Sequence, residues 1–407
     1  MAVFIFSKKQ SFLGILCCSR FRILDYNSGD CKLFCDLSEL ESLVKEEQVE
    51  KKTTDPKQEL SVALGHGVVG AFSPSGNLFA ICTNRKTLVV WNTSSWEYVS
   101  KRKLTKRATA ISFTQKEDTV IIADKAGDVY QYSAKDSVAK PSLLLGHLSM
   151  IMDMVVTDDN KFIVTADRDE KIRVSHYPNS YNIEAFCLQH QDFVSKICLL
   201  SKSGVLASGG GDGSIHFWDF RIGRLLHTEQ MEEEKGQQIT EDGNKEKQKV
   251  SEVVACMACC QKNHVVCVVG EGSCEIQLFS VHQKSVTKLD TIVTSTPPWH
   301  VTFDPDGRLW CVQPNPKEPV LIFQAKCTGP DLKFSKLESP AKLPIYTSAS
   351  DWQYLEECTS KEPHLSTLRK KEVDNMTEYL TRKEERIKQK KDKIAAMSSP
   401  AKKIKVT

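Results

Sequence analysis

Two glycine-rich segments and one pair of cysteines have the residue types that bind phosphate groups or metal ions. Gly209–Gly213 and Gly270–Gly272 resemble phosphate-binding loops in composition. Such a loop joins a strand to a helix, whereas both segments lie between short apolar runs, so we interpret them as turns between strands. Cys256 and Cys259 have the spacing of a zinc or redox site, but two further ligands at comparable spacing do not follow. With no HExxH motif and no Ser-His-Asp set, the sequence predicts no catalytic residue and no metal site.

A different kind of chemistry is indicated by the charged segment ADRDEKIR at residues 166–173. Asp169 and Glu170 precede Arg173 by four and three residues, so Arg173 could brace a turn through charge-assisted hydrogen bonds. Arginine is enriched at protein interfaces, so we interpret the segment as a recognition turn; a merely solvated turn is the alternative. The segment Asp124–Asp128, one repeat earlier, is also charged and is expected to lie beside it.

The C-terminal part of the chain is basic. Residues 368–394 contain no Gly or Pro, and their apolar residues recur at three- and four-residue spacing, which predicts an amphipathic helix. The candidates for contact with RNA phosphates are Arg382, Lys383, Arg386, Lys388, Lys390, Lys391 and Lys393. Basic side chains along a helix bind phosphates without reading bases; a solubilising tail is the alternative. The segment 400–405 reads as a nuclear import signal or a loose nucleic-acid arm, which predicts a nuclear protein.

The elements that would position these residues follow from an internal repeat. Three series of positions recur with spacings of 41, 43 and 43 residues. The series are Phe72, Phe113, Val156 and Leu199; Leu88, Val129, Ile172 and Ile215; and Trp91, Tyr132, Ser175 and Trp218. A period of ~40–45 residues with about four short strands is typical of a β-propeller blade of the WD type.

Residues inside the repeat resemble the WD40 repeat, in which a His, a Ser or Thr, an Asp and a Trp form a buried hydrogen-bond chain. His190, Ser208, Asp212 and Trp218 match all four positions. A satisfied chain of this kind makes a blade rigid. The preceding unit has His147, Thr165 and Asp169 at the first three positions but Ser175 at the fourth, so that blade is expected to be held differently.

Weaker copies of the repeat before and after this region predict an all-β fold, a seven-bladed WD40 propeller with a C-terminal basic amphipathic helix. Val3 to Phe6 is expected to close the ring by pairing with the last blade, so that no sheet edge is left bare. The predicted parts are a propeller over 1–345 with mobile charged loops at about 36–60 and 229–250, a linker over 346–367, a basic helix over 368–396 and a disordered tail over 397–407.

Composition agrees with a large core. The 407 residues are 40% apolar and 26% charged, with a formal net charge of +3, and no apolar run approaches the ~18 residues that a membrane span requires. Most of the 15 cysteines lie in apolar runs. Free cysteine packs as a small buried hydrophobe and stays reduced in the cytosol or nucleus, so the sequence predicts a reducing compartment.

Four segments together resemble one particular family, the WD-repeat non-catalytic subunit of the tRNA (guanine-N7-)-methyltransferase. They are ADKAGDVY at 123–130, LLLGHLSM at 143–150, TADRDEKIRVS at 165–175 and NMTEYLTRKEERIKQ at 375–389. The resemblance covers the propeller and the C-terminal helix. The segment from GHLSM to IRVS is far more specific than a generic WD repeat, whereas the two charged loops and the last ten residues contribute nothing.

The resemblance implies a heterodimer. A Rossmann-like partner would bind S-adenosylmethionine and methylate N7 of a guanine in the tRNA variable loop, while this chain holds no cofactor, docks against the side of the partner, stabilises it and helps to hold the tRNA. The family's interface maps here onto Lys125, Arg168, Asp169, Glu170, Lys171 and Arg173. An alternative function comes from Trp218–Arg221, which fits the WDxR pattern of substrate receptors of cullin-based ubiquitin ligases.

Overall fold

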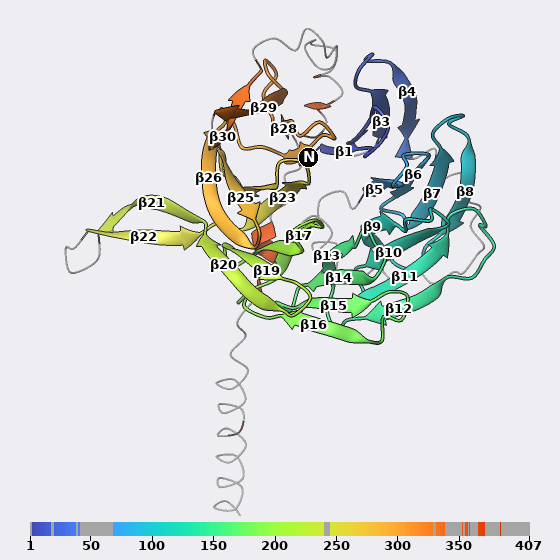
Figure 1. The fold of residues 1–407 in the computed structure, drawn as a ribbon, viewed down its shortest axis with the longest axis horizontal. Helices are drawn as coiled ribbons and strands as arrows, with labels where there is room; N and C mark the ends of the chain where they lie inside the picture. The colour runs from blue at the N-terminus through green and yellow to red at the C-terminus, as the bar shows by residue number, and fades with distance from the viewer. Residues whose placement is uncertain are drawn as a thin grey trace, which may run out of the picture. The chain divides into compact units, whose positions relative to one another are not determined.

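The fold was analysed in a computed structural model, which describes residues 2–17, 20–37, 40, 68–239, 245–328, 331–337, 352, 355, 356, 358, 365–370 and 383. These residues form seven four-stranded antiparallel sheets and one two-stranded sheet (Figure 1). The first strands of the seven sheets contact one another in a closed ring, and each sheet runs outward from it. The predicted seven-bladed β-propeller is therefore confirmed.

The blades follow one another along the chain and are numbered 1 to 7 in that order. Blades 1 to 4 are β1 (Val3–Phe6), β2 (Phe12–Leu16), β3 (Arg20–Asp25) and β4 (Cys31–Asp36); β5 (Val69–Phe72), β6 (Leu78–Cys82), β7 (Thr87–Asn92) and β8 (Tyr98–Lys103); β9 (Ala108–Phe113), β10 (Thr119–Asp124), β11 (Asp128–Ser133) and β12 (Ser142–Gly146); and β13 (Ile151–Val156), β14 (Phe162–Asp167), β15 (Ile172–His176) and β16 (Ile183–Cys187). Blades 5 to 7 are β17 (Val194–Leu200), β18 (Val205–Gly210), β19 (Ser214–Asp219) and β20 (Arg224–Gln230); β23 (Val254–Cys260), β24 (Val265–Gly270), β25 (Glu275–His282) and β26 (Ser285–Val293); and β27 (His300–Phe303), β28 (Leu309–Val312), β29 (Val320–Thr328) and β30 (Asp331–Lys336).

Burial within a blade depends on the position of the strand. In β14 and β18, the second strands of their blades, every residue is buried, because both faces of the sheet pack against neighbouring blades. The fourth strands β16 and β20 are mostly exposed. The apolar runs in the sequence therefore mark inner strands, and the outer strands read as polar or mixed segments.

The prediction for closure of the ring is wrong. β1 (Val3–Phe6) pairs with β2 inside the first blade, and the last sheet is built from β27 to β30 alone. Side chains close the ring instead. The ring of Phe6 lies 5.1 Å from that of Trp310, and Phe4 packs on the same indole. Apolar burial between two complete blades thus replaces a shared strand.

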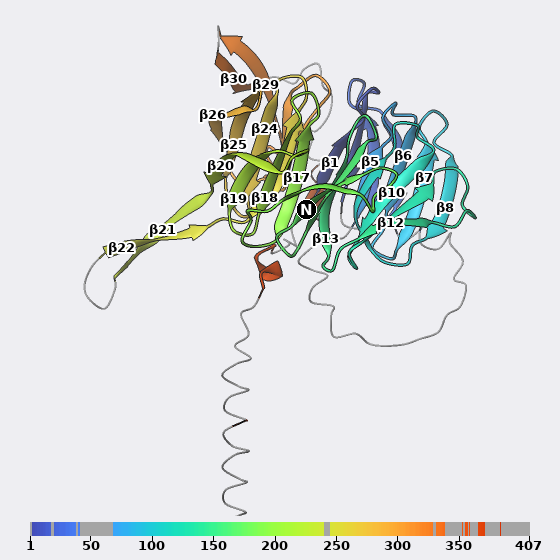
Figure 2. The same ribbon diagram turned by 60° about the horizontal axis from the view of Figure 1, so that its bottom comes forward.

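The segment 229–250, predicted as a mobile loop outside the blades, contains regular structure. β20 extends to Gln230, and β21 (Glu232–Ile239) then pairs with β22 (Lys245–Ser251) as a two-stranded hairpin. Figures 1 and 2 show this hairpin projecting from the rim beside β20. An antiparallel pair satisfies the backbone groups between its strands without apolar anchors, so composition did not reveal it. In the other predicted loop, Asp36 ends β4 and Leu37 and Leu40 are buried, and residues 41–60 lie outside the described residues.

The predicted linker over 346–367 also differs from the structure. Leu355 and Cys358 are fully buried in the cluster that closes the ring, and Trp352 stacks on Trp299. A 3₁₀ helix follows at Leu365–Leu368, and Met1–Arg369 form one compact unit. Of the predicted basic helix, residues 371–382 and 384–396 lie outside the described part, as does the tail 397–407. Among the described residues, no helix is long and apolar enough to cross a membrane.

Candidate functional site

Blade 5 contains the four residues that match the WD40 hydrogen-bond chain. Nε2 of His190 lies 2.8 Å from Oγ of Ser208, and Nε1 of Trp218 donates to the same hydroxyl at 2.9 Å. Nδ1 of His190 lies 3.1 Å from a carboxylate oxygen of Asp212. The chain therefore joins strands β18 and β19 to the segment that precedes β17, so its role is to hold the blade together.

The same network extends further than the sequence indicates. Oγ of Ser214 lies 3.0 Å from both Nδ1 of His190 and Nε2 of His216, and Nδ1 of His216 lies 2.9 Å from Oγ1 of Thr228 on β20. Ligand atoms of His190, Asp212 and His216 lie within 4.8 Å of one another, a spacing that could hold a metal ion. Their ring nitrogens and the carboxylate are all hydrogen-bonded, however, so the arrangement is complete as a structural network.

This network shifts the protonation of two of its members. Burial, followed by the nearby His190, lowers the pKa of His216 to about 4. Burial raises the pKa of Asp212, but its hydrogen bond and charge interaction with His190 and its bonds from Ser214 and Gln191 outweigh this, so the pKa lies well below its usual range. His216 is therefore neutral, and Asp212 ionised, at neutral pH.

Blade 4 uses a different acid from the one expected. Nε2 of His147 lies 2.7 Å from Oγ1 of Thr165, but its Nδ1 lies 2.8 Å from Asp167, and Asp169 does not occupy this position. The expected absence of tryptophan has a visible effect, because the hydroxyl of Ser175 is fully buried without a hydrogen-bond partner among the described residues. Sequence spacing predicted the wrong carboxylate, two residues too far along the turn.

Asp167 also organises the charged turn that the sequence singles out. Its Oδ1 accepts hydrogen bonds from the backbone N–H groups of Asp169 and Lys171, both at 2.9 Å. Glu170 has a left-handed backbone with φ of 71°, at the position where blade 5 has Gly213 with φ of 74°. A non-glycine residue there is unfavourable by ~1 kcal/mol, so this turn holds its charged residues at a cost in stability.

Arg173, predicted to brace the turn, joins blade 4 to blade 3. Its Nη1 donates to the carbonyl oxygen of Gly146, the last residue of β12, at 3.0 Å. Burial lowers the pKa of this guanidinium, while Asp167 opposes that shift. Arg173 lies opposite Phe186 in the pairing of β15 with β16, so these two side chains share one face of the blade.

Exposed apolar side chains lie on or beside the fourth strands of blades 3 to 5. Leu148 follows the Gly146 carbonyl that Arg173 binds, Phe186 is 41% exposed, and the turn at Gly223 packs against the backbone of Phe186. The exposed apolar residues of this region are Leu143, Leu148, Tyr181, Ile183, Phe186, Leu188, Ile222 and Leu225. We call this set the apolar rim. Apolar side chains gathered beside charged ones mark interaction surfaces.

The other predicted contact residues lie on two turns. Lys125 is exposed on the turn between β10 and β11, and Lys171 is exposed on the turn between β14 and β15. Arg168 is partly buried, and its Nε donates to the carbonyl oxygen of Leu368 at 2.9 Å. Among the predicted RNA contacts, Lys383 is described and exposed, and the other six lie outside the described residues.

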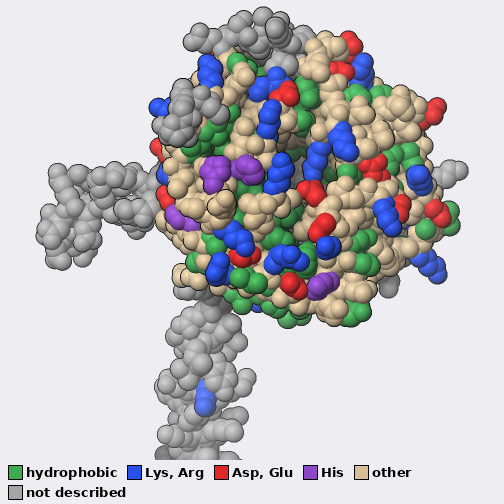
Figure 3. Space-filling model, viewed as in Figure 1, with side chains coloured by type: hydrophobic (Ala, Val, Ile, Leu, Met, Phe, Trp, Pro, Cys, Tyr) green, Lys and Arg blue, Asp and Glu red, His purple; other side chains and the backbone are tan. Residues whose placement is uncertain are grey.

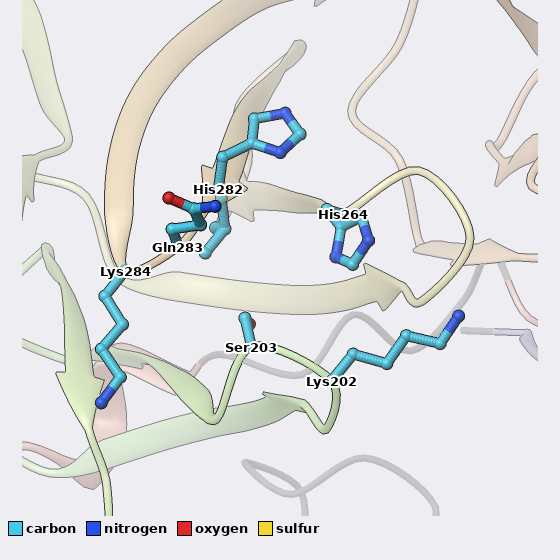
Figure 4. Close-up of a pocket in the computed structure, with 7 residues that line it drawn as sticks. Lys202, Ser203, His264, His282, Gln283 and Lys284 are labelled. Carbon is cyan, nitrogen blue, oxygen red and sulfur yellow. The ribbon is translucent and has the colours of Figure 1, made fainter.

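A cavity of about 470 Å³ lies between blades 5 and 6, and none of the residues that line it was predicted as a site residue from the sequence. Figure 4 shows its polar side chains coming from three turns, with Lys202 and Ser203 on one, His264 on another, and His282 to Lys284 on the third. These groups could hold an anion, although Nζ of Lys284 is already paired with Asp219 at 2.6 Å. Three separate segments form the cavity, so no local motif revealed it.

The glycine-rich segments and the cysteine pair, considered above as candidates for phosphate and metal binding, lie in turns between strands and within a strand. Gly209–Gly213 connects β18 to β19, and Gly270–Gly272 follows β24 before β25, so both are turns between strands as predicted. Cys256 and Cys259 lie three residues apart on β23, and their side chains therefore point to opposite faces of the blade. Cys256 lies against the backbone of Val301 and Cys259 against that of Leu199, so the two thiols do not face a common site.

Three curated relatives and a family model resemble the chain. The model, described as the tRNA methyltransferase TRM82 WD40 domain, matches residues 44–138 and 131–312. A Danio rerio protein named tRNA (guanine-N(7)-)-methyltransferase non-catalytic subunit wdr4 is 34% identical over 378 residues, covering 90% of this chain and 88% of its own length. The Homo sapiens protein with the corresponding name, WDR4, is 32% identical over 337 residues, covering 81% of this chain and 80% of its own. A Drosophila yakuba non-catalytic subunit, wuho, is 36% identical over 45% of this chain and 44% of its own.

Solved structures share the fold at low identity. A chain from a structure titled "Crystal Structure of Mitotic Checkpoint Complex" has a TM-score of 0.58 and 14% identity, and covers 83% of this chain and 90% of its own. One titled "Structure of U3-55K" has a TM-score of 0.58 and 15% identity, and covers 76% and 87%. These similarities concern the propeller alone.

Proposed function

The chain belongs to the family of WD-repeat non-catalytic subunits of the tRNA (guanine-N7-)-methyltransferase, and from this membership we propose how it supports the reaction. It assembles with a catalytic subunit as a heterodimer, stabilises that subunit and helps to hold the tRNA while N7-methylguanosine forms in the variable loop. The observation that carries this proposal is a charged turn on blade 4 together with exposed apolar side chains on the outer strands of blades 3 to 5.

The proposed partner surface combines the apolar rim with the charged residues beside it. These are Lys125, Asp169, Glu170, Lys171 and Arg173, and the sequence predicts Arg168 in the same contact. Apolar area supplies binding free energy, and charged groups at its margin select the partner. Arg173 belongs to both parts, because it is opposite Phe186 in the sheet and binds the carbonyl of Gly146. The apolar rim of this surface lies on the outer strands of the propeller, which fits docking against the side of a second subunit.

S-adenosylmethionine binds, in this proposal, to the catalytic subunit alone. The glycine-rich turns of this chain join two strands, and a dinucleotide-like or S-adenosylmethionine loop would need a helix after the glycines. Calorimetry of the purified chain should therefore detect no cofactor binding and no methyl transfer. Micromolar binding to the chain alone would contradict the proposal.

Positive charge on the chain would serve tRNA binding and nuclear entry. On the face drawn in Figure 3, Lys and Arg side chains gather around the centre of the ring. The basic segment 382–393 adds seven cationic groups, and each phosphate contact steepens the dependence of affinity on salt. Removing residues 382–407 should lower tRNA affinity of the heterodimer, flatten its slope against log salt and reduce nuclear accumulation. Equal slopes for the full and truncated heterodimers would show that the segment does not touch RNA.

A role as a cullin-ligase receptor has no comparable support. In the WDxR motif, Trp218 donates to Ser208 in the core of blade 5, Asp219 pairs with Lys284, and Arg221 lies 5.0 Å over the ring of Phe162. The side chains of the motif therefore make contacts within the propeller that stabilise it. Affinity capture of the tagged chain, followed by identification of the stoichiometric partner, separates the two functions: we expect a methyltransferase-like subunit, and a ligase adaptor in its place would favour the alternative.

Arg173→Leu tests the proposed surface directly. The substitution removes a partly exposed charge from the surface, and we expect the complex with the catalytic subunit to weaken by about 1–3 kcal/mol, roughly 5- to 150-fold, while the fold loses less. Arg85→Leu, which removes an exposed charge from the turn between β6 and β7 of blade 2, is the control and should leave assembly unchanged. Co-purification yield and the melting temperature of the free chain give the two readouts. A collapse in melting temperature with unchanged assembly would assign Arg173 to the fold.

A further inference from the structure

Residues 365–369 pack against the propeller, although they lie far along the chain from its last strand, β30. Leu368 is fully buried in a cluster with Met150, Met152, Phe193 and Val253. Met150 and Met152 belong to the start of blade 4, Phe193 precedes blade 5, and Val253 precedes blade 6. The side chain of one leucine is therefore buried against residues from three blades.

Polar contacts on both sides fix the same segment. Glu271, on the turn between β24 and β25, accepts hydrogen bonds from the backbone N–H groups of Leu365 and Ser366. Arg168, on the charged turn of blade 4, donates from Nε to the carbonyl oxygen of Leu368 at 2.9 Å. Arg369 adds a bond from Nη2 to the carbonyl oxygen of Gly211 at 2.8 Å. Turns of blades 4, 5 and 6 are thus joined through one short segment.

We infer that residues 365–369 are a latch that fixes the start of the basic C-terminal segment on the side of the propeller that carries the charged turn. Leu368 and Glu271 are positioning residues for RNA binding, and Arg168 acts in the latch through its bond to Leu368. The inference rests on the proposed role of the basic segment in holding tRNA. It adds that this segment works from a fixed point of attachment rather than from a free tether.

The physical reason is effective concentration. With the latch closed, the chain is fixed up to Arg369, one residue before the C-terminal part begins. With the latch open, the nearest fixed residue is the fully buried Cys358. A flexible chain of about 12 residues has a root-mean-square reach of ~20 Å. The cationic groups would then be spread through a larger volume, and RNA bound elsewhere on the complex would meet them at a lower effective concentration.

Leu368→Ser in the full-length heterodimer is the test, because it opens the latch without changing any charge. We expect tRNA affinity to fall by about 5- to 10-fold. The slope of log affinity against log salt should stay at the wild-type value, because every phosphate contact can still form once RNA is bound. Leu368→Met, which keeps an apolar side chain of similar volume, is the matched control and should retain the wild-type affinity.

The latch and the proposed RNA role can fail separately. If removing 382–407 changes neither affinity nor slope, the basic segment does not bind RNA and the proposed role fails. If that deletion weakens binding but Leu368→Ser does not, the latch inference is overturned. In a heterodimer that already lacks 382–407, Leu368→Ser should cause no further loss of affinity. An equal loss in the truncated and full-length complexes would mean that Leu368 acts through the propeller itself, which also overturns the inference.

Arg168→Ala provides an independent readout for the latch. It removes the donor to the Leu368 carbonyl, so it should reproduce the affinity loss of Leu368→Ser at unchanged salt slope. The melting temperature of the free chain should stay close to wild type, and tRNA affinity is measured per assembled heterodimer, because Arg168 is also predicted to contact the catalytic subunit. Loss of the catalytic subunit with unchanged tRNA binding per assembled complex would place Arg168 at the partner contact instead and contradict its role in the latch.

Discussion

Blades 4 and 5 are neighbours in the ring, and each holds a buried histidine by a hydroxyl on one nitrogen and a carboxylate on the other. In blade 5 the carboxylate is Asp212, in the middle of the turn between β18 and β19. In blade 4 it is Asp167, the last residue of β14. The backbone position equivalent to Asp167 is Gly210 in blade 5. A Cβ at Gly210 would lie 2.7 Å from both Asp212 Oδ1 and His190 Nδ1, so only one of the two arrangements fits in a given blade.

The two blades also differ at one position of the third strand. Thr165 pairs with Arg173 in blade 4, and Ser208 pairs with His216 in blade 5, so Arg173 and His216 occupy equivalent places. His216 is buried and completes the internal network, whereas Arg173 reaches the rim of blade 3. Blade 5 therefore uses its polar residues for internal stability. Blade 4 leaves the hydroxyl of Ser175 without a hydrogen-bond partner in the described part of the chain and presents charged groups at the surface.

The largest expected effect is loss of the carboxylate in blade 5. Asp212→Ala leaves His190, Ser214 and the backbone N–H of Gln191 without their acceptor, and should destabilise the fold by about 2–3 kcal/mol. Chemical denaturation of the purified chain measures this. Moving the acid to the position used in blade 4, as Gly210→Asp with Asp212→Gly, should recover about half of the loss. A double variant no more stable than Asp212→Ala would show that the two blades are not interchangeable.

A pH dependence should follow from His216. Its pKa is lowered to about 4 by burial, and an unfolded histidine titrates near 6.5, so the unfolded chain binds a proton at pH values where the folded chain does not. Stability is therefore complete above about pH 6.5 and decreases as the pH falls toward 4, by about 2–3 kcal/mol in total. Unfolding free energies measured at several pH values test this.

The control for the pH effect is His216→Asn, which removes the titrating group. Its stability should change less between pH 6.5 and 4 than that of the wild type, although it is less stable at neutral pH because the contact with Thr228 is altered. Below about pH 4 both proteins should lose stability further, because the carboxyl of Asp212 then binds a proton in the unfolded chain, whereas its lowered pKa keeps it ionised in the folded chain. Parallel curves above pH 4 would remove His216 from the explanation.

Smaller changes in stability, of opposite sign, are expected from substitutions in the turn between β18 and β19 of blade 5 and in the turn between β14 and β15 of blade 4. Gly213→Ala puts a side chain on a left-handed residue and should cost about 1 kcal/mol, whereas Glu170→Gly relieves the same strain and should stabilise by about 0.5–1 kcal/mol. Glu170→Gly should at the same time weaken assembly with the catalytic subunit. Thermal unfolding and co-purification give both readouts. Unchanged assembly would mean that the strained glutamate has no role in recognition.

The smallest expected change in stability is that of Ser175→Ala, and Ser208→Ala is its comparison because both substitutions remove a buried hydroxyl. Ser208 accepts from Trp218 and contacts His190, so Ser208→Ala should cost about 1–3 kcal/mol. Ser175 is buried without such a partner among the described residues, and Ser175→Ala should change stability by less than about 0.5 kcal/mol, in the stabilising direction if at all. A loss at Ser175 as large as at Ser208 would indicate that blade 4 has an equivalent hydrogen-bond chain.

Sequence reasoning succeeded where a residue's role depends on its own blade. His190, Ser208, Asp212 and Trp218 lie within 29 positions of one another, and the local turn and strand pairing bring them together. It failed for Asp169, because a shift of two positions along a turn leaves the spacing plausible while moving the carboxylate away from His147. Composition also hid the hairpin of β21 and β22, since backbone pairing does not require an apolar pattern.

The sequence by itself determined the number and type of blades, because each blade repeats the same order of four short strands at a spacing of about 40–45 residues. It also determined the family, through the four segments at 123–130, 143–150, 165–175 and 375–389. The tertiary structure alone decided how the ring closes, through Phe6 and Trp310, and where Leu368 docks, on residues from three blades. These contacts join positions hundreds of residues apart, and their free energy depends on the shape that the assembled ring presents, which no local pattern encodes.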